Sequence, residues 1–284
     1  MRTLVHLSDL HFGRVDMAVI PVLAETVCRL HPDLVVVSGD LTMRARNSEF
    51  ASARAFLNAL PCPQIVVPGN HDVRPFYAPW ARWRSPLRRF YEAIPDAAEP
   101  SYADEELGVI GLNSARSATV KGGRVNQLQV SRVCEWFDRL PSGAIRAVVT
   151  HHPFDLPPAH NPRHLVGRAR MAMAALAGCG VDLFLSGHLH LSYAAPTSER
   201  YSTEGHSALI IHAGTATSLR ARGEVNSWNL LRIARPWMDL HRYSWNEQDG
   251  KFLVSQEQRF QHTADGWRSM TAPSEMKPRF GQSR

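Results

Sequence analysis

The 284-residue sequence predicts an α/β protein whose strands form two sheets. In the first two thirds of the chain, short apolar runs alternate with segments whose apolar residues recur at helical spacing, which is typical of α/β folds. After about residue 205, apolar runs follow one another with only short turns between them, which favours antiparallel strands. We expect these later strands to complete a second sheet that packs against the first.

Each expected element follows from its local pattern. The strands are short runs rich in β-branched and other apolar residues, at 3–7, 33–38, 64–67, 107–112, 145–150, 181–186 and 208–213. Helices are expected at 19–30, 50–60, 130–140 and 168–177, where apolar residues recur every three or four positions. The later antiparallel strands are expected in the segments ALIIHAG, SWNLLRIA, MDLHRYSW and KFLVSQEQRF.

No domain boundary, internal repeat or glycine-rich phosphate loop is visible in the sequence. We therefore expect one domain over residues 1–267. Residues 268–284 are polar, contain proline and lack periodicity, which predicts a disordered C-terminal tail.

Composition favours a soluble cytoplasmic protein. Hydrophobic residues make up 44% of the chain and charged residues 20%, as in ordinary globular domains. The N-terminus enters a strand at once, which leaves no room for a signal peptide, and no apolar run has the length of a membrane span. The four cysteines have no CxxC spacing, so we expect free core thiols rather than disulfides or zinc ligands.

The basic residues raise the question of nucleic-acid binding. The net charge is +6, and the densest arginine cluster, between Arg74 and Arg89, is interleaved with Phe76, Tyr77, Trp80 and Trp83. Arginines with aromatic neighbours are typical of nucleic-acid surfaces. However, helical spacing relates the two tryptophans to apolar residues that follow them, namely Leu87, Phe90 and Ile94. We therefore expect this aromatic stripe to face the core.

Metal-ligating side chains follow five of the expected strands. The strand exits read SDLH at Asp9 and His11, SGDL at Asp40, PGNHD at Asn70, His71 and Asp72, THHP at His151 and His152, and SGHLH at His188 and His190. A single HxH is as compatible with a surface pair as with two metal ligands. Strand ends in open α/β sheets converge on one crevice, and the five exits together are hard to explain without a shared site.

The residue types indicate which metals such a site would hold. Mixed carboxylate, amide and imidazole ligands suit Mn, Fe, Zn or Co better than Mg or Ca. Two such ions about 3.5–4 Å apart form the clamp used in phosphoryl chemistry. A carbonyl hydrolase can use similar metals, so the ligands alone favour phosphoester cleavage only moderately.

The ordered series DxH, GD, GNHD, HHP and GHLH resembles the calcineurin-like metallophosphoesterase superfamily. The resemblance spans residues 9 to 190 and implies a four-layer sandwich of two mixed β-sheets flanked by helices. It implies a first metal held by Asp9, His11 and His190, and a second held by Asn70, His151 and His188. It further implies that Asp40 bridges the two divalent ions, with Mn or Fe favoured, and that His71 is the catalytic histidine.

Within that superfamily, the chain most resembles bacterial class III cyclic-nucleotide phosphodiesterases and glycerophosphodiesterase relatives. The GNHD form departs from the GNRD form of the UDP-diacylglucosamine hydrolases, which argues against that nucleotide-sugar lipid pyrophosphatase role. DNA-repair nuclease subunits share GNHD but usually carry a capping domain, for which no clear segment is visible. We expect a dinuclear phosphodiesterase acting on a small diester, with a nuclease as the main rival and a non-catalytic metal-binding interaction module as the other alternative. The oligomeric state stays open, with a homodimer as one option.

Other polar residues near the motifs have competing interpretations. Asp72 either orients His71 or is purely structural, and His152 either contacts substrate or packs behind the ligands. His6 is expected to be a hydrogen-bonded core histidine. The long loop 154–167, with His160 and His164, has the length of a substrate lid, but plain surface exposure is favoured.

Overall fold

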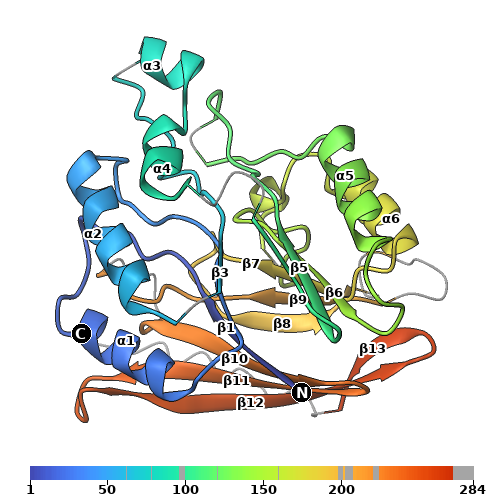
Figure 1. The fold of residues 1–284 in the computed structure, drawn as a ribbon. Helices are drawn as coiled ribbons and strands as arrows, with labels where there is room; N and C mark the ends of the chain where they lie inside the picture. The colour runs from blue at the N-terminus through green and yellow to red at the C-terminus, as the bar shows by residue number, and fades with distance from the viewer. Residues whose placement is uncertain are drawn as a thin grey trace.

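Two mixed β-sheets face each other, and helices cover their outer sides (Figure 1). The computed structural model describes residues 1–61, 63–77, 79–95, 100–119, 121–158, 160–197, 201, 207–219 and 224–270. Apolar side chains from both sheets interdigitate between them, including Leu4, Val36, Val149 and Leu185. This arrangement confirms the expected architecture of two mixed sheets flanked by helices.

The first sheet has seven strands in the order β13-β12-β11-β10-β1-β2-β3. Its parallel part consists of β1 (Arg2–Leu7), β2 (Leu34–Val37) and β3 (Gln64–Val66). Its antiparallel part consists of β10 (Ser227–Ala234), β11 (Trp237–Asn246), β12 (Lys251–Thr263) and β13 (Gly266–Ser269). Strand β10 joins the two parts because it pairs antiparallel with β1, with Val5 opposite Leu230.

The second sheet has six strands in the order β4-β5-β6-β7-β9-β8. Strands β5 (Leu107–Gly111), β6 (Ile145–Val149), β7 (Leu183–Ser186) and β9 (Leu209–His212) are parallel. The antiparallel edge strands are β4 (Ser101–Ala103) and β8 (Tyr193–Pro196).

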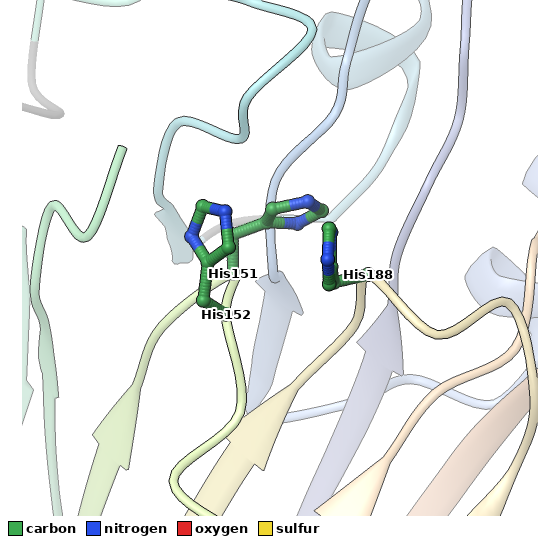
Figure 2. Close-up of side chains that lie close together, drawn as sticks. All are labelled: His151, His152 and His188. Carbon is green, nitrogen blue, oxygen red and sulfur yellow. The ribbon is translucent and has the colours of Figure 1, made fainter. Parts of the chain in front are cut away.

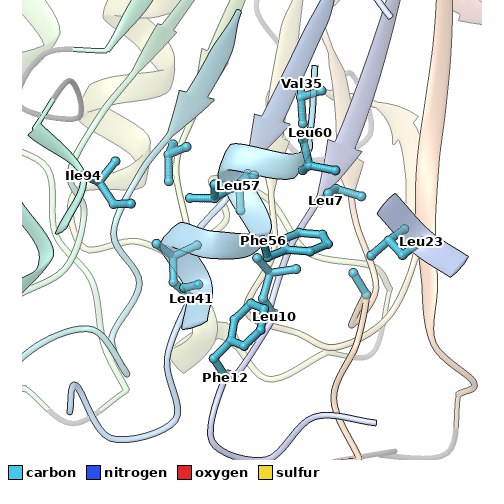
Figure 3. Packing of buried hydrophobic residues seen from close by; sticks show 14 of the residues in the cluster. Leu7, Leu10, Phe12, Leu23, Val35, Leu41, Phe56, Leu57, Leu60 and Ile94 are labelled. Carbon is cyan, nitrogen blue, oxygen red and sulfur yellow. The ribbon is translucent and has the colours of Figure 1, made fainter. Parts of the chain in front are cut away.

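Helices bury one apolar face each. The first sheet is covered by α1 (Val19–Arg29) and α2 (Asn47–Ala59), and α4 (Arg88–Ala93) packs against α2. Phe56 and Leu57 of α2 and Leu23 of α1 lie over the strands in this layer (Figure 3). The second sheet is covered by α5 (Gln127–Phe137) and α6 (Ala169–Gly178). The remaining short helices are α3 (Pro79–Arg84) and a 3-10 helix (Pro162–His164).

The placement of the C-terminal strands differs from the expectation. Strands β10 to β13 are antiparallel as predicted, but they extend the first sheet rather than completing the second. The segment ALIIHAG forms β9, which is parallel to β7 inside the second sheet. Local sequence sets the extended conformation of such a strand, but its partner depends on contacts with residues far away in the chain.

The expectation of one core-facing aromatic stripe between Trp80 and Ile94 was wrong for its first half. Leu87, Phe90 and Ile94 are buried, but Trp80 is 81% exposed and Trp83 is 76% exposed. The physical reason is a break between α3 and α4 at Ser85 and Pro86, because proline does not continue a helix. The helical spacing therefore does not carry across the break, and α3 lies at the outer end of the molecule (Figure 1).

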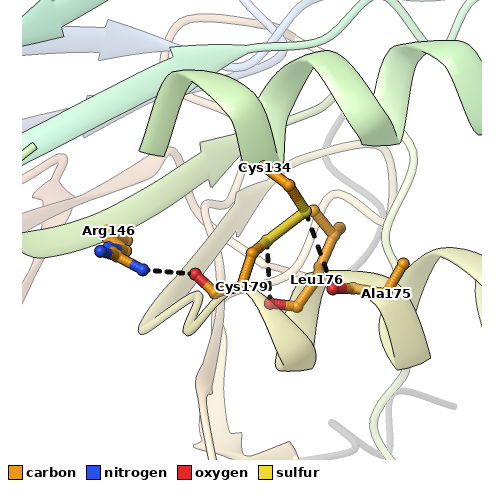
Figure 4. Close-up of a disulfide and its surroundings, with 5 residues drawn as sticks. All are labelled: Cys134, Arg146, Ala175, Leu176 and Cys179. Carbon is orange, nitrogen blue, oxygen red and sulfur yellow. Dashed lines mark hydrogen bonds between the residues drawn. A yellow bond between two sulfur atoms is a disulfide. The ribbon is translucent and has the colours of Figure 1, made fainter. Parts of the chain in front are cut away.

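The expectation of free thiols was wrong for two cysteines. Cys134 of α5 and Cys179, which follows α6, form a disulfide with their Cα atoms 5.4 Å apart (Figure 4). The two positions are 45 residues apart in sequence, and only the packing of α5 against α6 brings them together. Cys28 is a free thiol, as expected, and Cys62 lies outside the described residues.

Strand β13 continues to Ser269, two residues past the expected end of the domain at 267, and residues 271–284 of the predicted tail lie outside the described residues. None of the helices in the described ranges combines the length and the apolar character needed to cross a bilayer.

Candidate functional site

The loops that leave β1, β2, β3, β6 and β7 meet at one end of the two sheets. Backbone hydrogen bonds align the first two loops, because the amide of Asp9 donates to Gly39 O over 3.0 Å and that of His11 donates to Asp40 O over 2.9 Å. The amide of Gly187 donates to His151 O over 3.2 Å and aligns the exits of β6 and β7. All seven predicted ligands and His71 are therefore brought together.

One group of ligand atoms surrounds Asp9. The Nε2 atoms of His11 and His190 each lie 3.5 Å from Asp9 Oδ1. The two imidazole rings stack with centroids 5.1 Å apart. Asp9 Oδ2 faces away from them and accepts hydrogen bonds from Ser8 Oγ (2.7 Å) and from the amide of His188 (3.0 Å).

A second group surrounds the amide oxygen of Asn70. His151 Nε2 lies 3.2 Å from this oxygen and His188 Nδ1 lies 3.1 Å from it. Asp40 lies between the two groups, because its Oδ2 is 3.4 Å from His151 Nε2 and 3.9 Å from His11 Nε2. This arrangement matches the two predicted ligand sets, with Asp40 between them.

Hydrogen bonds on the outer ring nitrogens orient two of these histidines. His151 Nδ1 lies 2.8 Å from Ser38 O, and His190 Nδ1 lies 2.7 Å from Thr215 Oγ1. Because a carbonyl only accepts, the first contact needs a proton on Nδ1, which leaves the Nε2 lone pair aimed at the centre of the site. Metal-ligating histidines are usually held in this way.

The site has the features expected of a metal centre. Asp9 Oδ1 is buried and accepts no hydrogen bond, which is costly unless a cation compensates it. Ligand atoms of Asp9, His11 and His190 lie within 4.8 Å of one another, as do those of Asp9, Asp40 and His151. The donor set therefore fits divalent transition ions.

The protonation equilibria reflect a tightly coupled buried cluster. Burial opposes ionisation of both carboxyl groups, but nearby imidazoles outweigh it and lower the pKa of Asp9 and, further, that of Asp40. Burial opposes protonation of His151, but the Asp40 carboxylate raises the pKa of His151 to about 9. Burial and the neighbouring His151 lower the pKa of His188 to about 3.

The ligand loops have unusual backbone conformations. Five of the predicted ligands have positive φ: Asp9 (53°), His11 (51°), Asp40 (52°), His188 (70°) and His190 (59°). Positive φ is uncommon for residues other than glycine and costs of order 1–3 kcal/mol at each position. Gly39 also has positive φ (92°), and a side chain there would collide with His151. These loops are therefore held in strained conformations that aim the ligands inward.

Asp72 links the loop that carries Asp40 to the loop that carries Asn70. Its buried carboxylate accepts hydrogen bonds from the amides of Leu41 (3.1 Å), Thr42 (2.9 Å) and Gly69 (2.9 Å), and from Thr42 Oγ1 (2.8 Å). Burial and the negative charge of Asp40 raise the pKa of Asp72 to about 6. Asp72 is therefore a positioning residue for two ligand loops, as one of its two interpretations proposed.

His71 lies beside the first group of ligands and lines the cavity above them. Its ring meets that of His11 edge to face, with centroids 5.0 Å apart. Its amide donates to Asp40 Oδ1 over 2.8 Å, and its Nδ1 lies 2.8 Å from Met43 O. Since a carbonyl only accepts, this contact places a proton on Nδ1 and leaves Nε2 for chemistry.

Two neighbouring histidines differ in their roles. The rings of His152 and His188 lie close together, with centroids 4.8 Å apart (Figure 2). However, the nitrogens of His152 already contact Ser114 Oγ (2.9 Å) and Lys121 O (3.1 Å). His152 is therefore a packing residue behind the ligands.

The expected exposure of His164 was wrong. His164 is half-buried, and its Nδ1 lies 3.3 Å from His188 Nε2. Only the folded path of loop 154–167 brings it there. His160 is half-buried earlier in the same loop.

A cavity of about 460 Å³ lies above the ligands. Besides the ligands and His71, its lining includes Met43, Arg44, Arg46, Phe76, Tyr77, Arg82, Lys121 and His164. The sequence did not indicate Arg44, Arg46 or Lys121 as site residues. The strand-exit pattern contains a signal for the first two, because both closely follow the SGDL motif.

Comparison with known proteins agrees with this geometry. The family model described as calcineurin-like phosphoesterase matches residues 2–192. The glycerophosphodiester phosphodiesterase GpdQ of Enterobacter lignolyticus is 29% identical over 166 residues, which cover 53% of this chain and 56% of that protein. A probable cyclic nucleotide phosphodiesterase of Synechococcus sp. is 27% identical over 175 residues, which cover 57% of this chain and 59% of that protein. The match therefore spans little more than half the length of these relatives.

Solved structures share the fold at low sequence identity. A dimetal phosphatase from Danio rerio superposes with a TM-score of 0.63 at 14% identity, over 89% of this chain and 98% of that one. A purple acid phosphatase from yellow lupin superposes with a TM-score of 0.63 at 11% identity, over 89% of this chain and 52% of that one. Together with the family match over residues 2–192, the fold and the clustered strand-exit motifs establish that this chain belongs to the calcineurin-like phosphoesterase family.

Proposed function

We propose that this chain is a dinuclear metal-dependent phosphodiesterase that hydrolyses a small organic phosphodiester, with cyclic nucleotides among its substrates. The observation that carries the proposal is the position of Asp40 between two ligand groups, within 4 Å of both His151 and His11. The phosphodiesterase names of the two relatives agree with this reaction class.

Two divalent transition ions, with Mn or Fe favoured, would be held by the residues of the two groups. Asp9, His11 and His190 would hold the first ion, Asn70, His151 and His188 the second, and Asp40 both. Bound there, such ions acidify a water molecule and neutralise charge on the phosphate oxygens.

The residues around the ligands perform the other tasks. Arg44, Arg46 and Lys121 line the cavity and supply positive charge for an anionic diester. His71 faces the same cavity with Nδ1 held against Met43 O. In its imidazolium form, Nε2 can give a proton to the departing alkoxide, a form of help worth typically about 10²–10⁴-fold in rate.

Metal content is the first test. Protein purified without chelator should contain about two transition ions per chain by elemental analysis. Asp40→Ala should disturb both ions, whereas His11→Ala should mainly weaken one. One ion per chain with full activity would contradict the dinuclear proposal.

Hydrolysis is the second test. Bis(p-nitrophenyl) phosphate should be cleaved in the presence of Mn²⁺, and 3′,5′- and 2′,3′-cyclic nucleotides and glycerophosphodiesters should be compared beside it. If none of these diesters is hydrolysed while two metals are bound, the proposed activity is wrong.

The role of His71 has a separate test. His71→Ala should keep both metals and lose much more rate on diesters with alkyl leaving groups than on p-nitrophenyl esters, whose anion departs unaided. Equal losses on the two classes would reject proton donation and leave His71 as a phosphate-positioning residue.

A cytoplasmic location stays a prediction that cell fractionation tests. The disulfide between Cys134 and Cys179 is of a type more common in oxidising compartments, so the redox state of this pair in cells should be measured in the same fractions.

A further inference from the structure

The aromatic side chains that were expected in the core instead form an exposed ridge beside the metal-ligand cavity. Phe76 is 53% exposed, Tyr77 77%, Trp80 81% and Trp83 76%. Large exposed apolar patches usually mark binding surfaces. We call these four residues the aromatic ridge.

The ridge is continuous with the candidate site. Phe76 and Tyr77 line the same cavity as Asn70 and His71. Trp80 and Trp83 are three residues apart on α3 and therefore share one side of that helix, farther out. A ligand that extends out of the cavity can thus pass from Phe76 and Tyr77 to the two tryptophans.

The base of the ridge is rigidly anchored. The buried guanidinium of Arg82 lies under the ring of Phe76, 3.8 Å from its centroid. Arg82 also donates to Ser117 O over 2.7 Å, to Thr119 O over 2.6 Å and to Arg74 O. Because this arginine is committed to backbone carbonyls, it holds α3 in place while the outer aromatic rings stay exposed.

Exposed basic residues accompany the ridge. Arg44, Arg46 and Lys121 are exposed at the mouth of the cavity, and Arg84 is exposed at the end of α3. Flat rings beside a positively charged path are the features with which proteins bind single-stranded nucleic acid: bases stack on the rings and phosphates face the cations. A membrane-inserting surface usually includes aliphatic side chains as well, whereas every large hydrophobic side chain exposed among the described residues between 73 and 92 is aromatic.

We propose that the aromatic ridge binds single-stranded nucleic acid and directs one of its phosphodiester linkages into the metal-ligand cavity. This inference rests on the proposed phosphodiesterase function and extends its substrates from small diesters to single strands. In the reaction, a water oxygen bonds to phosphorus, the ester P–O bond breaks, and a proton passes to the leaving oxygen, so no oxidant or further co-reactant is needed.

Binding of a phosphorothioate-linked oligo(dT), which resists hydrolysis, tests the ridge in the metal-loaded protein. The double variant W80A/W83A should bind it at least about 5-fold more weakly, since stacking on one aromatic ring is typically worth about 5- to 150-fold in affinity. W80F/W83F should keep most of the affinity, because the rings remain. The matched control is W237A, which removes a partly exposed tryptophan from β11 (39% exposed) and should bind as the unaltered protein does.

Salt dependence supplies a second measurement. Affinity for oligo(dT) should fall as salt rises, and Arg84→Gln should reduce the slope of log affinity against log salt by about 0.7, the value for one lost phosphate contact to a single strand. An unchanged slope would remove Arg84 from the proposed surface.

Activity separates this inference from the proposed function. W80A/W83A should hydrolyse bis(p-nitrophenyl) phosphate normally but cleave oligo(dT) with a reduced kcat/KM. If oligo(dT) binds through the ridge but no diester of any kind is cleaved, the proposed function fails and the binding surface stands.

Three results would overturn the ridge proposal. The first is equal affinity of W80A/W83A and the unaltered protein for oligo(dT). The second is tryptophan-dependent binding to vesicles of phosphatidylglycerol and phosphatidylcholine with no binding to oligo(dT), which would assign the ridge to a membrane surface. The third is self-association that W80A/W83A abolishes with no binding to oligo(dT), which would assign it to contacts between copies of this chain.

Discussion

Replacing Asp72 by alanine should damage both stability and metal binding. This carboxylate is the common acceptor for the amides of Leu41, Thr42 and Gly69, on the two loops that carry Asp40 and Asn70. The substitution leaves these donors buried without their acceptor and removes the link between the loops. Each donor left unsatisfied costs about 1–3 kcal/mol, so the three amides together predict a loss of roughly 3–6 kcal/mol, lowered if water enters.

The effect on metal binding follows from the same geometry. Residues that orient ligands typically change metal affinity or activity by about 10–100-fold when they are replaced. We expect a loss of this size for the ion between Asp40 and Asn70, measured by titration of Mn²⁺ into protein freed of metal. Asp72→Asn, which keeps one acceptor oxygen, serves if the alanine variant does not fold.

The matched control is Asp182→Ala. This buried carboxylate accepts hydrogen bonds from Arg146 N (2.9 Å), Arg235 Nη2 (3.0 Å) and Trp267 Nε1 (3.1 Å), at the other end of β7 from the ligands. Urea unfolding should show a similar loss of stability for Asp182→Ala and Asp72→Ala, but only Asp72→Ala should weaken metal binding. If both variants bind Mn²⁺ with the affinity of the unaltered protein, Asp72 is structural only and the reasoning is refuted.

Three further outcomes are expected. Burial lowers the pKa of His6 and of His212 to about 3; the unfolded chain therefore takes up these protons first, and stability should fall from pH 6.5 towards pH 3 by about 1.4 kcal/mol per pH unit for each histidine. His6→Phe should remove one such increment from the slope in urea unfolding at several pH values, and an unchanged slope would contradict it. Reduction of the Cys134–Cys179 disulfide should lower stability by about 4 kcal/mol from loop closure, as measured by thermal unfolding with and without dithiothreitol; an unchanged melting temperature would count against the bond. Gly69→Ala would push a methyl group into the carboxylate between the two ligand groups, so diester hydrolysis should be lost, and retention of full activity would show that the loop adapts.

The sequence by itself determined the class of fold and the members of the candidate site. The seven predicted ligands and His71 come together in the structure because each stands directly after a strand, and the exits of neighbouring parallel strands share one edge of a sheet. Strand, exit and ligand are local features, so a short stretch such as SGD or GNHD already fixes which side chains reach that edge. The hydrogen bonds that orient the ligands, such as His190 to Thr215, have no comparable local signal.

Only the tertiary structure decided the features that depend on distant segments. Pro86 ends α3, but its separation from the core, and with it the exposure of Trp80 and Trp83, depends on how Arg82 is bound by the loop at 117–119. The partner of Cys134 depends on the packing of α5 against α6, and the contact of His164 with His188 depends on the path of a long loop. In each case the deciding contact joins residues far apart in the chain, and its energy comes from burial and hydrogen bonds that exist only after folding.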